Sequence, residues 1–175
     1  TELETVDSER GVAVRLPGDE APNPIDTVVI LEIAGEPDIA PPPPIMLDSD
    51  GASLPAVKAT IHGSRARLEQ RGGQSNVGYW VDPSDYVTWS VKVAAGGRYD
   101  VKLTYACPHE SAGRRSVVGH QTGGPLPGTG GYGTFKTRTL GTLNLPEGEK
   151  MTVKARRTKE GGPYNLRSLD FVPAE

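Results

Sequence analysis

The sequence contains little of several features, and each of these shortages excludes some classes of structure or function. Among its 175 residues there is a single cysteine, Cys107, which excludes an internal disulfide framework and any multi-cysteine zinc site. No run approaches the roughly 20 apolar residues of a membrane helix, and no signal-peptide pattern opens the chain. A formal net charge of −3 argues against a general nucleic-acid binder. We therefore expect neither nucleic acid nor a membrane as partner.

Glycine and proline are plentiful, with 22 and 16 copies, and this balance favours short strands joined by turns over long helices. Between residues 56 and 175, apolar and polar residues alternate with a period of two, and turn sequences recur every 8–12 residues. The alternating runs are 87–93, 99–105, 151–155 and 168–171. This pattern is typical of antiparallel sheets with one wet face, so the predicted fold class is all-β, a sandwich or barrel.

The first third of the chain has a different character. Residues 12–16 and 27–33 read as two strands, too few for an independent sheet, so residues 1–34 look like the end of a preceding small β-sandwich. Residues 35–55 contain four consecutive prolines, which favour an extended polyproline II spacer. We expect a surface linker here, with a ligand for a proline-binding domain as the alternative.

Few residues are arranged for catalysis. Three histidines share no metal-ligand spacing and are read as ordinary surface or loop residues: His62, His109 and His120. A Cys107–His109 nucleophile is conceivable, but a lone loop cysteine is more often inert. Asp82 and Asp85 could act as general acid and base, yet the sequence DPSD is more often a turn whose aspartates bond their own backbone. The arginine-rich stretch 65–71 reads as the solvated face of a sheet.

Aromatic residues are scarce, at 6% of the chain, so their positions are informative. Four fit the buried faces of strands: Trp89, Tyr99, Tyr105 and Phe171. Tyr79, with Trp80, and Tyr132 instead lie among glycines in expected loops. Sugars pack C–H faces on aromatic rings and need paired donors and acceptors for their hydroxyls, so exposed loop tyrosines suit a sugar cleft. The alternative is that these tyrosines cap the core of the sandwich.

Three stretches resemble family 6 and family 35 carbohydrate-binding modules. They are GYWVDPSDYVTWSVKVAAGGRYDVKLTYACP (78–108), TGGYGTFKTRTLGTLNLPEGEKMTVKA (129–155) and YNLRSLDFVP (164–173). The resemblance covers most of residues 56–175 and implies a β-sandwich jelly roll, in agreement with the period-two pattern. It also implies a non-catalytic domain that binds a glycan and catalyses nothing itself.

The resemblance further implies the site residues. In that family a cleft at the loop end holds a sugar between two aromatic rings above an asparagine, which corresponds here to Tyr79, Tyr132 and Asn165. Arg167 stands near where the family often has aspartate and is included as a ligand-binding candidate. The family's structural calcium usually uses a Glu-x-Glu at the first strand. That region reads VKATIHG here, without an acid, so we expect no cofactor or metal, with a structural calcium as the alternative because Asp170 remains.

The stretch VAVRLPGDEAPNPIDTVVILEIAG (12–35) resembles the closing strands of family 29 α-L-fucosidases. This implies that a catalytic barrel precedes these residues, in a secreted or periplasmic glycosidase, and that the chain is its carboxyl-terminal part. The expected function is a module that binds glycan, with fucosylated material as a candidate, and so tethers the enzyme to its substrate. The alternative is a structural β-sandwich that packs on the catalytic domain and binds no glycan.

Overall fold

The computed structural model describes residues 3–8, 11–15, 30, 35, 42–108, 116–118, 121–122, 126–157 and 162–174. The chain divides into two compact units, Thr1–Pro41 and Pro42–Glu175. In the first unit, β1 (Glu4–Ser8) and β2 (Gly11–Arg15) form an antiparallel hairpin. The strand expected at 12–16 corresponds to β2, whereas the one expected at 27–33 falls outside the described residues except for Ile30.

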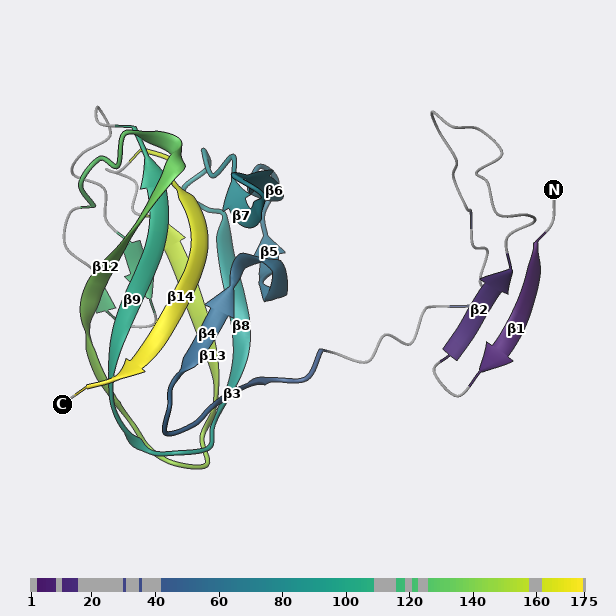
Figure 1. The fold of residues 1–175 in the computed structure, drawn as a ribbon, viewed down its shortest axis with the longest axis horizontal. Helices are drawn as coiled ribbons and strands as arrows, with labels where there is room; N and C mark the ends of the chain where they lie inside the picture. The colour runs from purple at the N-terminus through teal and green to yellow at the C-terminus, as the bar shows by residue number, and fades with distance from the viewer. Residues whose placement is uncertain are drawn as a thin grey trace. The chain divides into compact units, whose positions relative to one another are not determined.

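The second unit is a sandwich of two sheets (Figure 1). One sheet has the order β11-β10-β13-β8-β3, with β5 also paired to β8, and only the β3–β8 pair is parallel among its described pairings. Its strands are β3 (Ile45–Leu47), β5 (Thr60–His62), β8 (Tyr86–Val93), β10 (Ser116–Val118), β11 (Gln121–Thr122) and β13 (Lys150–Arg157).

The second sheet has the order β12-β9-β14-β7-β6, with β4 also paired to β14, and all of its described pairings are antiparallel. Its strands are β4 (Ala52–Pro55), β6 (Arg67–Arg71), β7 (Gln74–Gly78), β9 (Gly97–Cys107), β12 (Gly131–Leu145) and β14 (Asn165–Pro173). A short 3₁₀ helix, η1 (Ala56–Lys58), links β4 to β5. The predicted all-β sandwich is confirmed.

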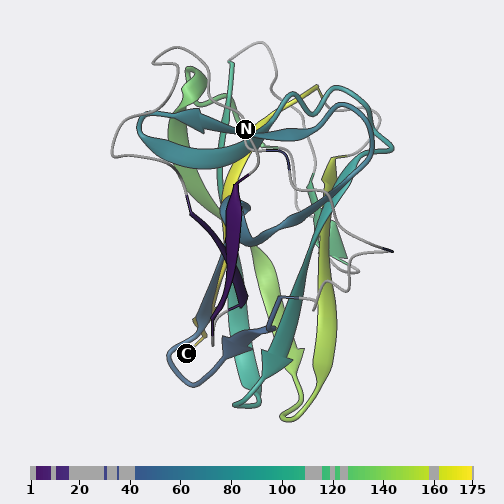
Figure 2. The ribbon, with the colours of Figure 1, turned by 90° about the vertical axis from the view of Figure 1, so that its right-hand side faces the viewer.

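The core lies between the two sheets, which face each other in the rotated view (Figure 2). Alternate residues of β8 and β9 point inward, as a period of two requires. All four aromatics assigned to strand faces are buried: Trp89, Tyr99, Tyr105 and Phe171. Polar atoms of these rings are hydrogen-bonded. The Trp89 indole N–H, for example, donates to the carbonyl of Pro55 at 3.0 Å. Burial of large aromatic rings with satisfied polar atoms is what stabilises a sandwich of this size.

The expected spacer at 35–55 needs a correction, because its last part belongs to the sandwich. β3 pairs with β8, and β4 pairs with β14. Leu47 and Leu54 are fully buried in the core. These strands are short and lie close to the proline run, so their apolar residues carry too little periodicity to be recognised. The sandwich therefore begins near residue 42 rather than at 56.

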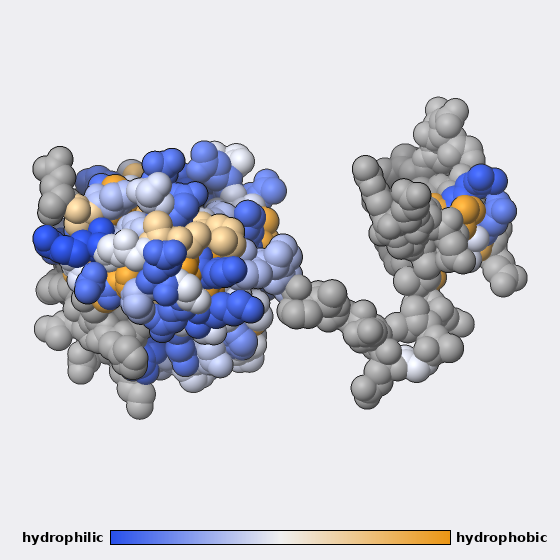
Figure 3. Space-filling view, turned by 90° about the horizontal axis from the view of Figure 1, so that it is seen from below, coloured by the Kyte–Doolittle hydropathy of each residue, from blue (hydrophilic) through white to orange (hydrophobic). Residues whose placement is uncertain are grey.

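The described residues include no helix that is long and apolar enough to cross a membrane. Figure 3 views the molecule from below, and this face of the sandwich carries mostly hydrophilic side chains with smaller apolar areas among them. The candidate site lies elsewhere, at the end where β9 finishes and β14 begins, with Ala106 opposite Asn165.

Candidate functional site

Tyr79 forms one wall of the site. It follows Gly78, the last residue of β7, and the residue is 47% exposed whereas the neighbouring Trp80 is fully buried. Tyr79 has φ of 54°, the only positive φ of a non-glycine residue among those described. A side chain in this region costs about 1–3 kcal/mol, so the fold around it must impose the conformation.

Trp80 imposes it. The indole N–H of Trp80 donates to the carbonyl of Asp85 at 2.8 Å, and its ring packs on Tyr164 with centroids 5.4 Å apart. A hydrogen bond of 2.8 Å from the Val81 amide to the Tyr79 carbonyl closes a tight turn around it. Burial of the indole therefore turns the backbone and directs the tyrosine ring outward.

Tyr132 forms the opposite wall. It is the second residue of β12 rather than a loop residue, and it is 37% exposed. Gly131 pairs with Cys107, but the register between β12 and β9 is broken from there to Lys136. Two residues before Gly131 the chain is held to β9, because the Thr129 hydroxyl accepts from the Cys107 amide at 2.9 Å. Because the pairing is irregular here, the direction of the Tyr132 ring is not set by the in-and-out alternation of side chains along the sheet.

Asn165 lies between the two walls at the start of β14 and is 3% exposed. Its amide nitrogen donates to Glu69 Oε1 and to the Tyr132 carbonyl, both at 2.9 Å. A buried amide that is hydrogen-bonded on both N–H groups has a defined orientation. Asn165 thus joins the backbone of the Tyr132 wall to Glu69.

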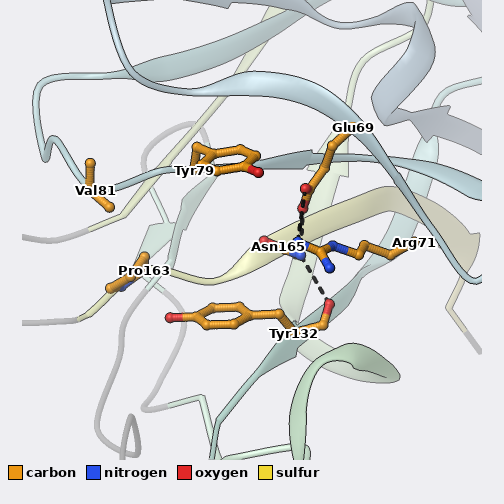
Figure 4. Close-up of a pocket in the computed structure, with 7 residues that line it drawn as sticks. All are labelled: Glu69, Arg71, Tyr79, Val81, Tyr132, Pro163 and Asn165. Atoms are coloured by element: carbon orange, nitrogen blue, oxygen red, sulfur yellow. Dashed lines mark hydrogen bonds and ion pairs between the residues drawn. The ribbon is translucent and has the colours of Figure 1, made fainter.

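These residues line a pocket with a volume of about 270 Å³ (Figure 4). The two tyrosine rings face the space from opposite sides, and the Asn165 side chain lies between them at one end. The pocket is lined by Glu69, Arg71, Tyr79, Val81, Tyr132, Pro163 and Asn165. The pocket is just below the usual range for small-molecule sites, so it suits one ring-sized group rather than a large ligand.

The sequence did not single out the charged residues of the pocket. Arg67, Glu69 and Arg71 alternate on β6, and this pattern reads as a solvated face. The pairing of β6 with β7 places Arg67 opposite Gly78 and so beside the Tyr79 wall. The Arg67 guanidinium lies 3.7 Å from the centroid of the Tyr79 ring, and Arg71 forms an ion pair of 3.3 Å with Glu69. Only the strand register brings these charges to the site.

Arg167, the fourth predicted site residue, does not line the pocket. It lies where the register between β14 and β9 shifts, between Leu166 and Ser168, so its side chain points away from the pocket. The guanidinium lies 3.5 Å from the centroid of the Phe135 ring and donates to the Arg71 carbonyl at 2.9 Å. Burial lowers the pKa of Arg167, although an arginine remains charged at neutral pH. Arg167 supports the strand that carries Arg71.

The interpretation of DPSD as a turn is confirmed, but only Asp82 is seen to bond the turn's own backbone, whereas Asp85 bonds a loop about 20 residues earlier. Asp82 Oδ1 accepts from the Ser84 amide and hydroxyl at 2.8 and 2.7 Å. Asp85 is fully buried, and its carboxylate accepts from three consecutive backbone amides, those of residues 64, 65 and 66. Both aspartates are therefore engaged in holding loops.

The other reactive side chains have structural surroundings. His62 stacks on Tyr86 with ring centroids 4.4 Å apart, and its Nε2 lies 2.9 Å from the Thr88 hydroxyl. Cys107 is buried. His109 and His120 lie outside the described residues. Within the described ranges, no three His, Cys, Asp or Glu side chains are grouped to hold a metal ion. The remaining candidate, Asp170, accepts from the hydroxyls of Ser53 and Ser168.

Comparisons with known proteins give the same fold. The structure superposes on a family 35 carbohydrate-binding module from Clostridium thermocellum with a TM-score of 0.57 and 23% identity, covering 72% of this chain and 100% of that one. It also matches a carbohydrate-binding module of lichenase 5A from Cellvibrio mixtus in complex with cellotriose, with a TM-score of 0.57, 23% identity and coverage of 71% and 98%. These matches establish the fold.

The fold is not confined to sugar-binding modules. The Cry4Aa toxin of Bacillus thuringiensis matches with a TM-score of 0.60 and 12% identity, covering 75% of this chain and 25% of that one. No family model matches the sequence, and a search of curated proteins found no match. The function must therefore be argued from the site.

Proposed function

We propose that residues 42–174 form a non-catalytic carbohydrate-binding module that holds one sugar ring between Tyr79 and Tyr132. The observation that carries this is the pair of exposed tyrosines on opposite sides of a pocket with buried Asn165 at its end. Aromatic faces suit the C–H surface of a pyranose, and polar groups at one end suit its hydroxyls. The strained backbone of Tyr79 adds support, because such strain clusters at binding sites.

Binding by this pocket is weak. A hexose has about 12 non-hydrogen atoms, and at about 0.3 kcal/mol per atom the binding free energy reaches roughly −4 kcal/mol, a Kd near 1 mM. Such an affinity suits a tether, since joining a weak module to an enzyme raises the local concentration of substrate. We infer that the parent is a secreted α-L-fucosidase-like glycosidase, supported by the resemblance of residues 12–35, and that the glycan is fucosylated.

The experiment is a glycan-array screen of the chain beside a Tyr79→Ala/Tyr132→Ala double variant. A matched control is Tyr86→Ala, which removes a tyrosine of β8 that does not line the pocket. We expect the wild type and the control to bind the same glycans and the double variant to bind none. Absence of binding by the folded wild type would reject the proposal and favour the structural module, because exposed tyrosines also suit contact with another protein domain.

The parentage is tested separately. The chain itself should cleave no nitrophenyl glycoside, whereas a longer protein that includes the preceding residues should cleave nitrophenyl α-L-fucoside. Cleavage of a different glycoside by the longer protein would reject the fucosidase assignment and leave the sugar-binding site untouched.

A further inference from the structure

Glu69 links the polar groups at the end of the pocket. Its Oε1 accepts from the Asn165 amide at 2.9 Å and from the Asn76 amide at 3.1 Å, while its Oε2 pairs with Arg71 at 3.3 Å. The Glu69 side chain is 14% exposed. A nearly buried carboxylate with three partners holds its neighbours more firmly than a surface ion pair does.

The partners of Asn165 fix which end of its amide faces the ligand. Glu69 Oε1 and the Tyr132 carbonyl are both acceptors, so the nitrogen must face them, and its two N–H groups are then used. The remaining polar atom is the oxygen, which points toward the space between the tyrosine rings (Figure 4). The base of the pocket therefore offers an acceptor and no donor from Asn165.

Gly78 allows this arrangement. A Cβ at residue 78 would lie only 2.2 Å from Glu69 Oε1 and 3.1 Å from Asn165 Oδ1. Any larger residue would push the carboxylate away from both asparagines. The glycine before the Tyr79 wall thus makes room for Glu69, and Asn76 holds Oε1 from the other side.

We propose that Glu69 is a positioning residue that fixes Asn165 as a hydrogen-bond acceptor, so that the pocket selects a sugar with a free hydroxyl donor at Asn165 Oδ1. Arg71 borders the same end of the pocket and supplies donors, so a neighbouring ligand oxygen acts as an acceptor. The ligand class is a sugar with a free hydroxyl facing Asn165 Oδ1 and a neighbouring oxygen that accepts from Arg71, and methylation or sulfation of the donating hydroxyl prevents binding. This inference rests on the proposed function.

The first test needs no ligand. In NMR spectra of the free protein, the side-chain N–H groups of Asn165 should exchange slowly with water compared with those of exposed Asn144. Glu69→Ala removes one of the two acceptors and should make the Asn165 side-chain N–H groups exchange faster than in the wild type, although the bond to the Tyr132 carbonyl keeps them slower than those of Asn144. Glu69→Gln keeps an oxygen at Oε1 and should preserve slow exchange. If the exchange rate of the Asn165 side-chain N–H groups is the same in Glu69→Ala as in the wild type, the positioning role of Glu69 is overturned.

The second test measures binding by calorimetry with the methyl glycosides of glucose, galactose, mannose, xylose and fucose. For the glycoside that binds, monodeoxy and monofluoro analogues separate the two roles, because fluorine accepts weakly but cannot donate. At one position fluorine should lower affinity about as much as deoxygenation, roughly tenfold, the effect of one buried hydrogen bond. Affinity retained with fluorine at every position would overturn the proposal.

Variants complete the test with the same glycoside. Glu69→Ala should lower affinity about tenfold, and Glu69→Gln should stay within about threefold, since it loses only the ion pair with Arg71. Glu147→Ala, an exposed acid between β12 and β13, is the control and should bind as the wild type does. If no glycoside binds while slow Asn165 exchange is present, the selection of a hydroxyl donor fails together with the proposed function. Binding without slow exchange overturns the role of Glu69 alone.

Discussion

The middle of the sandwich and its pocket end follow opposite rules. In the middle, β8 and most of β9 alternate fully buried with more exposed residues, so one face of each strand meets the core. At the pocket end the alternation fails at three places: the positive φ of Tyr79, the register break after Gly131, and the shift around Arg167. Regular strands build stability, whereas irregular backbone directs the Tyr79 and Tyr132 rings to the pocket and the Arg167 side chain away from it.

This contrast predicts that a change in the middle affects stability most. Trp89→Ala removes a ring that is 2% exposed and a hydrogen bond to the Pro55 carbonyl. The free energy of unfolding should fall by about 4 kcal/mol, the usual cost of truncating a buried aromatic. Urea denaturation followed by tryptophan fluorescence measures it. A loss under about 1 kcal/mol would mean that the two sheets are not packed as described.

The next largest effect is expected at Asp85, where the middle of the sandwich meets the pocket end. Asp85→Ala leaves three buried backbone amides, those of residues 64 to 66, without their acceptor. We expect a loss of about 3 kcal/mol in the free energy of unfolding. Asp82→Ala is the control, because Asp82 Oδ1 accepts from the Ser84 amide and hydroxyl within an exposed turn, and it should cost about 1 kcal/mol or less. Equal losses in the two variants would contradict this ranking.

A smaller effect is expected at alkaline pH. Burial first, and then electrostatic repulsion from Cys107, raises the pKa of Tyr105 above its ordinary value of 10.0, against a smaller lowering by Arg138. The folded state therefore holds the phenolic proton of Tyr105 more tightly than the unfolded state does. The stability that this difference contributes is complete below pH 10.0, the ordinary pKa, and is lost as the pH rises through the higher pKa of the folded state. At neutral pH the Tyr105→Phe variant should be less stable than the wild type, because it lacks the hydrogen bond to the Pro127 carbonyl. As the pH rises above 10.0, its free energy of unfolding should fall less than that of the wild type. Parallel losses in both proteins would contradict the assignment.

The smallest expected effect is that of a chelator. Because no acidic cluster occurs in the described part of the chain, and Asp170 is engaged by Ser53 and Ser168, EDTA should leave the melting temperature unchanged. Differential scanning calorimetry with and without EDTA, followed by added calcium, provides the measurement. A drop that calcium restores would locate a metal site outside these residues.

The same contrast explains what the sequence could predict. Period-two patterns recognised β8, β9, β13 and β14, because a residue's side in a regular strand depends on sequence alone. Tyr79, Tyr132 and Asn165 meet at one pocket as the resemblance implied. Glu69 and Arg71 were missed, because their place beside the pocket depends on the β6–β7 register. Arg167 falls outside the pocket because a register shift, which no local pattern signals, redirects its side chain.

The central claim is that the chain accepts strain at Tyr79 in order to present a ring to a sugar. The most direct measurement compares Tyr79→Gly with the wild type in both unfolding and glycan binding. Glycine tolerates φ of 54°, so we expect the free energy of unfolding to stay equal or rise by about 1 kcal/mol while binding is lost. A variant that unfolds more easily but binds as well as the wild type would contradict the account.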